Sequence, residues 1–261
     1  MKSVVFNILI GLCVCTLFCQ CKKDEKKASS PEEIVAQIEK DMIKVDSATF
    51  TMGATPDQGA EASHQEKPAH KVTLSPYSIG KTEVTQAQWN AVMGTNPSAN
   101  KGNNYPVENV SWDDCQQFIA KLNQMTGKNY RLPTEAEWEF ACRGGSKSTN
   151  GKYSGGDKVL DHAWFALNKQ GRTHEVATKE PNELGIYDMS GNVAEWCSDG
   201  FGMYTEEPQT NPTGVDTNDH RVFRGGNWHS QPKECRSAYR NCKLKDFKDA
   251  GLGFRLVLPA K

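Results

Sequence analysis

This sequence has little excess charge of either sign and few apolar residues, and each shortage excludes a class of protein. It carries 31 basic and 32 acidic side chains, for a formal net charge of −1, so nothing in its electrostatics favours binding to nucleic acid. Apolar residues make up only 37% of the chain, whereas glycine occurs 22 times and proline 12 times. This composition favours a turn-rich fold of short elements over a helix bundle or a doubly wound sheet.

The compact motifs of many catalytic and metal sites are also missing. The sequence contains no phosphate-binding glycine loop, dinucleotide fingerprint or nucleophile elbow. It has no His-x-His, His-x3-His or Cys-x2-Cys spacing, so a closed zinc site is not expected. The glycine pairs at 144–145, 155–156 and 225–226 stand alone and are typical of turns.

A long apolar run occurs only at the amino terminus. Val4 to Phe18 are too few to span a bilayer comfortably and end among cysteines, just before the charged segment 22–27. This arrangement resembles a bacterial lipoprotein signal. We therefore predict a signal peptide at 1–21, acylation of Cys21 (or of Cys19), and a lipid-anchored protein of the bacterial cell envelope. Ordinary secretion is the alternative, because Phe18-Cys-Gln20 is not the run of small residues expected before the cut.

Capping signals and short β-branched runs predict the local structure that follows. Each expected helix begins at a serine or threonine with an acid or amide in the next turn. These caps are Ser30, Thr85, Ser111 and Thr134. Strands are expected at 42–45, 49–52, 70–74 and 77–79, the first two joined as a hairpin around Asp46-Ser47. Residues 22–40 are interpreted as a tether with a short helix, and residues 41–261 as one domain.

The stretch 182–199 combines turn formers, acids and aromatic residues within eighteen positions. Asp188 and Glu195 flank Gly191 and Asn192, so carboxylates and turned backbone carbonyls can converge on one point. A hard cation such as calcium is held in this way, by several oxygen ligands at once. In the alternative interpretation, Asp188 caps a turn and Glu195 pairs with an arginine. Spacing by itself leaves both open.

Three long motifs carry a family resemblance. The first, at 131–145, reads Arg-Leu-Pro-Thr-Glu-Ala-Glu-Trp-Glu-Phe-Ala-Cys-Arg-Gly-Gly, and the second, at 185–196, reads Gly-Ile-Tyr-Asp-Met-Ser-Gly-Asn-Val-Ala-Glu-Trp. The third runs from Arg-Val-Phe-Arg-Gly-Gly-Asn-Trp at 221–228, through Cys-Arg-Ser-Ala-Tyr-Arg at 235–240, to Gly-Phe-Arg-Leu at 253–256. Over residues 42–258 the chain thus resembles the formylglycine-generating enzyme, or sulfatase-modifying factor, family. The resemblance implies an irregular α+β fold related to C-type-lectin-like domains, with short helices around small, mostly antiparallel sheets.

Active members of that family share a Cys-x4-Cys pair whose sulfurs bind copper(I) and drive oxidation of a substrate cysteine to formylglycine. Soft thiolates are the expected ligands of this ion. Counted forward from Gly226, Ser230 takes the first cysteine position and Cys235 the second. Counted back from Arg240, neither cysteine has a counterpart. At least one thiolate is missing either way, so copper is not expected, and Cys235 is the single candidate catalytic residue.

The resemblance also implies a calcium ion in the 182–199 stretch. The family's ligands correspond here to the side chains of Asp188 and Glu195 and to the backbone carbonyls of Gly191 and Val193. Both acids are retained. We therefore expect a structural calcium, which would fix a loop-rich chain that regular hydrogen bonding cannot fix alone.

Export would place the remaining five cysteines in an oxidising compartment, where disulfides persist. These cysteines are Cys115, Cys142, Cys197, Cys235 and Cys242. An odd number leaves at least one thiol unpaired. Cys197 with Cys235 is the favoured pair, because both lie beside family motifs expected to meet in the fold, and Cys142 with Cys242 is the second.

These inferences favour an exported, lipid-anchored family member that lacks oxidase activity and binds a protein or small ligand. The resemblance places its binding cleft at Trp228, His229, Ser230, Tyr239 and Arg240, although plain packing would also explain the two aromatic residues. The alternative function is a copper-dependent formylglycine-generating oxidase acting on a sulfatase-type protein, through Cys235 alone or with Cys242. A third is a surface receptor with a diversified terminal segment, as in lectin-fold variable proteins.

Overall fold

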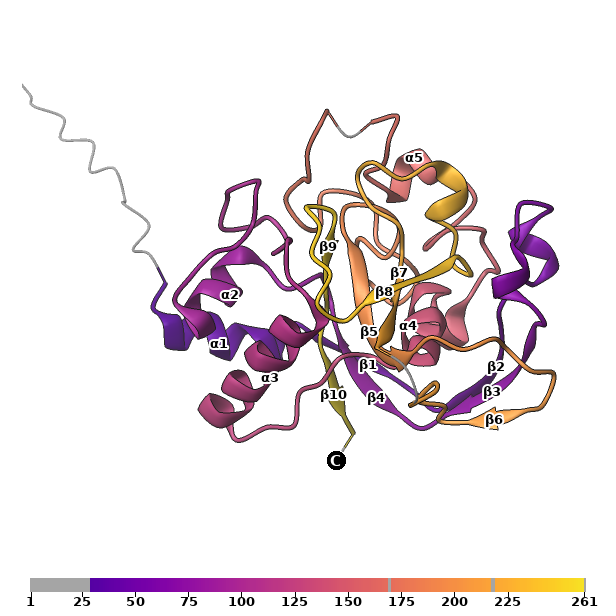
Figure 1. The fold of residues 1–261 in the computed structure, drawn as a ribbon, viewed down its shortest axis with the longest axis horizontal. Helices are drawn as coiled ribbons and strands as arrows, with labels where there is room; N and C mark the ends of the chain where they lie inside the picture. The colour runs from indigo at the N-terminus through magenta and orange to yellow at the C-terminus, as the bar shows by residue number, and fades with distance from the viewer. Residues whose placement is uncertain (1–28, 169, 217–218, 261) are drawn as a thin grey trace, which may run out of the picture.

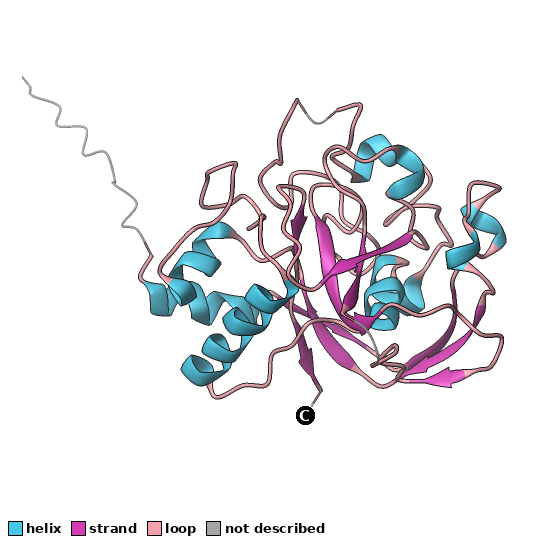
Figure 2. Ribbon diagram, viewed as in Figure 1, coloured by secondary structure: helices cyan, strands magenta, loops and turns pink. Residues whose placement is uncertain are grey.

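The structure is a computed structural model that describes residues 29–168, 170–216 and 219–260. The predicted signal peptide, including Cys21, lies outside these ranges. Five short α-helices surround three small sheets in the described part (Figures 1 and 2). No helix in it is long and apolar enough to cross a membrane. The predicted α+β class, with short helices and small sheets, is confirmed.

The elements follow one another along the chain with loops between them. The helices are α1 (Pro31–Lys40), α2 (Gln86–Met93), α3 (Trp112–Thr126), α4 (Glu135–Cys142) and α5 (Val159–His162). The strands are β1 (Met42–Val45), β2 (Ala48–Met52), β3 (His70–Leu74), β4 (Tyr77–Gly80), β5 (Ala194–Gly200), β6 (Gln209–Thr210), β7 (His220–Arg224), β8 (Arg240–Leu244), β9 (Leu252–Gly253) and β10 (Val257–Pro259).

Side-chain capping explains where the first four helices begin. Ser30, Thr85, Ser111 and Thr134 each accept a hydrogen bond from the backbone N–H three residues on, and the side chain at that position bonds back to the cap. These reciprocal bonds satisfy amide groups that the helix itself leaves unpaired. The four predicted helices are therefore confirmed. α4 differs from the others in that all eight of its residues are buried.

The first four strands form one long antiparallel ribbon, and the predicted hairpin around Asp46-Ser47 is wrong. β1 pairs with β4 and β2 with β3 in a single continuous register, from Met42 opposite Gly80 to Met52 opposite His70. The ladder is interrupted at Pro76, which has no amide hydrogen to donate. Asp46-Ser47 lies at that interruption, and the chain reverses only in the loop 53–69.

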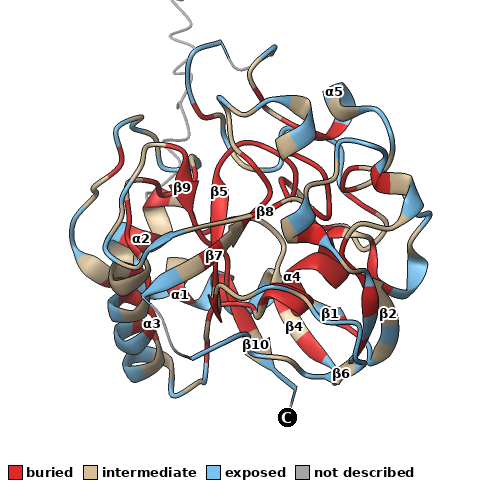
Figure 3. Cartoon of the chain, turned by 45° about the vertical axis from the view of Figure 1, so that its right-hand side comes forward, coloured by how far each residue is buried: buried red, intermediate tan, exposed pale blue. Residues whose placement is uncertain are grey.

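β5 is an inner strand of the four-stranded sheet, whose order is β8-β7-β5-β9. Six of its seven residues are buried, so both of its faces contact the protein interior (Figure 3). Trp196 belongs to the core cluster that includes residues of α1, α2 and α3, and Cys197 belongs to the cluster that includes α4. The end of β5 thereby places residues 199 and 200 beside α4, where a cavity opens.

Candidate functional site

Cys235, the single candidate catalytic residue, is completely buried. It follows the turn Pro232–Glu234 and packs with Tyr153, Ala163 and Phe165, apart from the two main core clusters. Burial raises the pKa of the Cys235 thiol to about 12, because an apolar environment disfavours the thiolate. Without a metal the thiol is therefore protonated at neutral pH, and its sulfur is enclosed by protein and not presented at the surface.

Three of the five predicted cleft residues lie together in the loop after β7. The Trp228 indole N–H donates to the backbone carbonyl of Ala250 at 3.0 Å, and the His229 ring meets the Trp228 ring edge-on at 4.9 Å between centroids. The Ser230 hydroxyl bonds to Asn227 within the same loop, at 3.1 Å to its backbone N–H and 3.2 Å to its side-chain oxygen. This hydroxyl therefore stabilises the turn that carries it.

Arg240, the fifth predicted cleft residue, is buried against α4 instead. Its guanidinium donates to both carboxylate oxygens of Glu135, with Nε 2.6 Å from Oε1, and to the backbone carbonyl of Gly202 at 2.7 Å. The guanidinium also lies 4.0 Å from the centroid of the Tyr204 ring. Of the five predicted cleft residues, only Arg240 lines the cavity described next. Tyr239, the fourth, is half-buried, and its hydroxyl accepts a bond from Asn241 at 3.3 Å.

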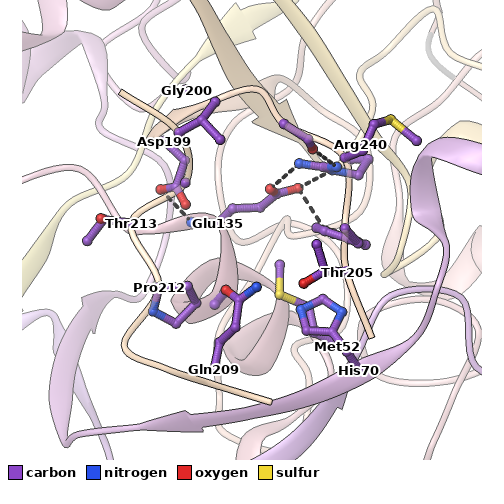
Figure 4. A pocket seen from close by; sticks show the side chains of 16 residues that line it. Met52, His70, Glu135, Asp199, Gly200, Thr205, Gln209, Pro212, Thr213 and Arg240 are labelled. Carbon is purple, nitrogen blue, oxygen red and sulfur yellow. Dashed lines mark hydrogen bonds and ion pairs between the residues drawn. The ribbon is translucent and has the colours of Figure 1, made fainter. Parts of the chain in front are cut away.

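A cavity of about 270 Å³ opens beside the Arg240–Glu135 pair (Figure 4). Its walls come from the end of β2, the start of β3, α4, the end of β5, β8 and the segment 200–215, so segments far apart in the sequence enclose it. Both polar and apolar side chains line it; they include Met52, His70, Tyr204, Thr205, Gln209, Pro212 and Thr213. The rings of His70 and Tyr204 pack against each other at 4.8 Å.

Asp199 closes one wall of this cavity and is only 3% exposed. Its Oδ2 accepts hydrogen bonds from the backbone N–H of Glu135 and from the Ser198 hydroxyl, both at 2.9 Å. Its Oδ1 has no hydrogen-bond partner among the residues that the structure describes. Burial, together with the negative charge of Glu135, raises the pKa of Asp199 to about 7.

A buried ion network forms the floor behind the cavity. Arg224 donates to Glu135 at 2.8 Å and to Glu139 at 2.6 Å, while Arg143 donates to Glu139 at 2.9 Å. Arg240 completes the network through its bonds to Glu135. Burial would raise the pKa of Glu135, but the charges of Arg240 and Arg224 outweigh it and hold this pKa below its usual value. Each buried charge in the network is therefore compensated by an opposite one.

Asp188 and Glu195 of the 182–199 stretch are also buried, and Glu195 pairs with an arginine as one interpretation predicted. Arg255 donates to both Glu195 oxygens at 2.6 Å, and the Trp138 indole donates to one of them at 2.7 Å. Asp188 has a left-handed backbone with φ of 58°, and its Oδ2 accepts the backbone N–H of Ala177 at 2.7 Å.

Three buried carboxylate oxygens near this point accept no hydrogen bond: Oδ1 of Asp188 and both side-chain oxygens of Glu83. Burial, and then the neighbouring Asp188, raise the pKa of Glu83 well above its usual value. These oxygens are suitable ligands for a hard cation. No three His, Cys, Asp or Glu side chains within the described ranges are arranged to hold a metal. A cation here would therefore also need backbone carbonyls, such as those of Gly191 and Val193.

Neither predicted disulfide is formed, because all five cysteines in the described part of the chain are free thiols. Cys197 points into the core cluster that contains α4, whereas Cys235 packs in a separate small cluster. Cys142, at the end of α4, is buried in the same core as Cys197, while Cys242 is half-buried on β8. The family motifs do meet in the fold, but they direct these thiols to different places.

The sequence interpretation missed three acids that the structure makes prominent: Asp199, Glu135 and Glu83. Glu135 enters the sequence analysis only as part of the motif at 131–145, and Asp199 only as the last residue of the stretch 182–199. One signal was available for α4. Glu135 and Glu139 are four residues apart, with Trp138 and Phe140 between or beside them, so a helix with apolar residues on several faces must bury its acids too.

Comparison with known proteins agrees with the fold. The chain matches the family model of the sulfatase-modifying factor enzyme 1-like domain over residues 27–260. It is 32% identical over 249 residues to the chaperone protein LppX of Paenibacillus barcinonensis, an alignment that covers 76% of this chain and 82% of that protein. It is 36% identical over 191 residues to the formylglycine-generating enzyme of Streptomyces coelicolor, which covers 66% of this chain and 58% of the enzyme.

Solved structures show the same similarity. Treponema denticola variable protein 1 superimposes with a TM-score of 0.78 at 31% identity, covering 84% of this chain and 95% of the other. PvdO from Pseudomonas aeruginosa superimposes with a TM-score of 0.74 at 28% identity, covering 84% and 94%. The architecture that the sequence motifs implied is therefore confirmed.

Proposed function

We propose that this chain, which belongs to the family of sulfatase-modifying factor enzyme 1-like domains, is a ligand-binding member that does not oxidise cysteine. The observation that carries this proposal is the complete burial of Cys235, whose side chain packs in a small cluster that contains no other cysteine. Copper(I) in this family is held by a pair of soft thiolates, and one enclosed sulfur does not present such a pair. The relative from Paenibacillus is named a chaperone protein, which supports a role in binding another protein.

We expect the full protein to take up no stoichiometric copper(I) and to leave a Cys-x-Pro-x-Arg peptide unmodified, since no pair of thiolates is presented. Copper uptake is measured by competition with a chromophoric copper(I) chelator, and aldehyde by mass spectrometry after hydrazide labelling. The Streptomyces enzyme serves as the positive control, and Cys235→Ser should behave like the parent. Copper-dependent aldehyde formation that Cys235→Ser abolishes would establish the oxidase alternative instead.

The cavity beside Arg240 is the binding site we propose. Arg240 lies only five residues after Cys235. The segment in which the Cys235 thiol is buried therefore also provides a residue that lines the cavity. The cavity is backed by an ion network in which Arg240 and Arg224 bind the carboxylates of Glu135 and Glu139, so its floor is held by buried charge pairs. A largely pre-formed hollow with a few polar groups is the usual form of a ligand site.

We further propose a structural calcium ion held by the carboxyl of Asp188 and the backbone carbonyls of Gly191 and Val193, with Glu83 beside them. Glu195, the other acid that the resemblance implied, is already paired with Arg255 through both of its oxygens and would not be a ligand. The unpartnered oxygens of Asp188 and Glu83 support this assignment. Saturating calcium should raise the melting temperature, because a ligand at 100 times its Kd stabilises the native state by about 2.7 kcal/mol.

Melting curves with millimolar calcium and with a chelator measure this effect, and Asp188→Asn and Glu83→Gln should each reduce it. Magnesium, which demands a tighter octahedral site, serves as the matched control ion and should stabilise less. Identical melting temperatures in calcium and in chelator would count against the site.

We also propose that Cys21 anchors the mature chain to a membrane of the bacterial cell envelope through a lipid. Only nine residues separate it from α1, which begins at Pro31, so the anchor would hold the domain close to the bilayer. A clickable fatty acid fed to expressing cells should label the protein, and Cys21→Ser should remove the label and release the protein into the soluble fraction. Cys19→Ser is the control and should remain labelled. An unlabelled wild-type protein would indicate ordinary secretion.

A further inference from the structure

We propose that the cavity beside Asp199 binds a primary ammonium group, either from a lysine side chain of a partner protein or from a small free amine. This inference rests on the proposed function, since it takes the cavity as the ligand site, and it adds the chemistry of the ligand. It depends on which charges around the cavity already have partners and which do not.

The carboxyl of Asp199 is the one lining group in the described part that presents an unpartnered charged atom to the cavity. Both hydrogen bonds that it accepts go to Oδ2, at 2.9 Å each, and Oδ1 receives none. Yet Asp199 is 97% shielded from bulk water, given its 3% exposure. Unlike Oδ1 of Asp188, Oδ1 of Asp199 is not among the buried side-chain atoms that lack a partner, so it is open to the cavity. A cation placed there would compensate the charge of an otherwise buried carboxylate.

The cationic side chain at the cavity is not available to an anion. Arg240 donates to both oxygens of Glu135, to Gly202 and, at 3.2 Å, to the carbonyl of Gln65. Arg224 behind it is shared between Glu135 and Glu139. An anionic ligand would have to break one of these buried pairs, whereas a cationic ligand would add the missing partner of Asp199. The charge balance therefore selects a positive ligand.

The geometry at Asp199 selects an ammonium over a guanidinium. A guanidinium binds a carboxylate best through two parallel bonds, one to each oxygen. Oδ2 of Asp199 already accepts two bonds from the protein, so only Oδ1 is open. An ammonium group is a compact charge that needs one such oxygen and can donate its remaining hydrogens to nearby acceptors. Thr205, Gln209 and Thr213 surround the cavity and can supply them (Figure 4).

The size and the walls of the cavity fit a short aliphatic amine. Its volume of about 270 Å³ lies just below that of drug-sized ligand sites, which span roughly 300–1,000 Å³. Met52 and Pro212 also line it and offer apolar surface to the methylene groups of a lysine-like chain. Long amines commonly bury such stems while their charged end finds a polar partner.

Isothermal titration of the full mature protein at pH 8 tests this proposal. The probes are n-butylammonium and the Nα-acetyl methylamides of lysine, norleucine and arginine. Norleucine resembles lysine in length but lacks its charge. Arginine carries the same charge on a planar guanidinium, which favours two parallel bonds to a carboxylate. We expect the lysine derivative to bind about 10- to 100-fold more tightly than norleucine, the range given by a hydrogen bond to a charged group, and more tightly than arginine.

Asp199→Asn should lower the affinity for the lysine derivative by a similar factor. The amide oxygen can still accept the two hydrogen bonds from Glu135 and Ser198, but the negative charge is lost. Asp246→Asn, at an exposed position, is the matched control and should leave the affinity unchanged.

Tighter binding of the lysine derivative than of n-butylammonium would indicate that the ligand is a lysine of a partner protein. Tighter binding of n-butylammonium would indicate a small free amine. Equal binding of lysine and norleucine, no binding of any amine, or an unchanged affinity in Asp199→Asn would overturn the proposal. The proposed function fails by a different result, copper-dependent aldehyde formation, so the two failures are distinguishable.

Discussion

Replacing Arg224 by alanine should lower the free energy of unfolding by about 3–5 kcal/mol, the cost of breaking a buried ion pair from one side. Arg224 is completely buried and donates to Glu135, to Glu139 and, at 2.7 Å, to the backbone carbonyl of Ser237. Its loss would leave two carboxylates under-compensated where water does not reach them. Because a domain of this kind is stable by only about 5–15 kcal/mol, the effect is a large share of the total.

Urea unfolding followed by circular dichroism measures this loss. Arg224→Met, which keeps an apolar stem of similar length, should remain strongly destabilised, since the missing charge and not the missing volume causes the effect. Lys245→Ala is the matched control, because its pair with Asp219 is solvent-exposed and should leave the midpoint of unfolding unchanged. An Arg224→Ala midpoint equal to that of Lys245→Ala would show that the network contributes nothing to stability.

Replacing Asp199 by asparagine should stabilise the protein at neutral pH by up to about 4 kcal/mol and have little effect at pH 4. The pKa of Asp199 is about 7 in the folded chain, against roughly 4 in an unfolded one. The folded state therefore holds a proton that the unfolded state releases, so this contribution to stability is present below pH 4 and is lost as the pH rises through 7. Three pKa units at about 1.4 kcal/mol each give the expected size.

The measurement compares wild type and Asp199→Asn by urea unfolding from pH 4 to pH 8. The other acids titrate in both proteins, so their contributions cancel when the two unfolding free energies are subtracted. The remaining difference should widen between pH 4 and pH 7 and then stay constant. Asp246→Asn, at an exposed position, should show no such trend. A difference that does not change with pH would mean that Asp199 is not a buried, protonated group. If Asp199→Asn is more stable than wild type at neutral pH, as expected, then a loss of amine binding in this variant cannot be attributed to unfolding.

Local sequence signals predicted the helices, because a cap depends only on residues a few positions apart. Ser30 with Glu33, Thr85 with Gln88 and Thr134 with Glu137 satisfy one another's backbone groups within a single turn. The hairpin prediction failed for the opposite reason. Two short β-prone runs around Asp46-Ser47 look the same locally whether they pair with each other or, as here, with the segment 70–80. β5, buried on both faces, lacks the alternation that would have marked it as a strand.

What the sequence determined by itself was therefore the family, the class of fold and the starts of four helices. Only the tertiary structure decided where the acids and arginines meet. Arg240 and Glu135 are 105 residues apart, and Arg255 and Glu195 are 60 apart. Sequence spacing carries no information about such pairs, because a charged side chain is held by whichever partner the packed core brings within hydrogen-bonding distance. The open oxygen of Asp199 arises in the same way: the backbone of α4 and Ser198 occupy one of its oxygens, and the cavity leaves the other free.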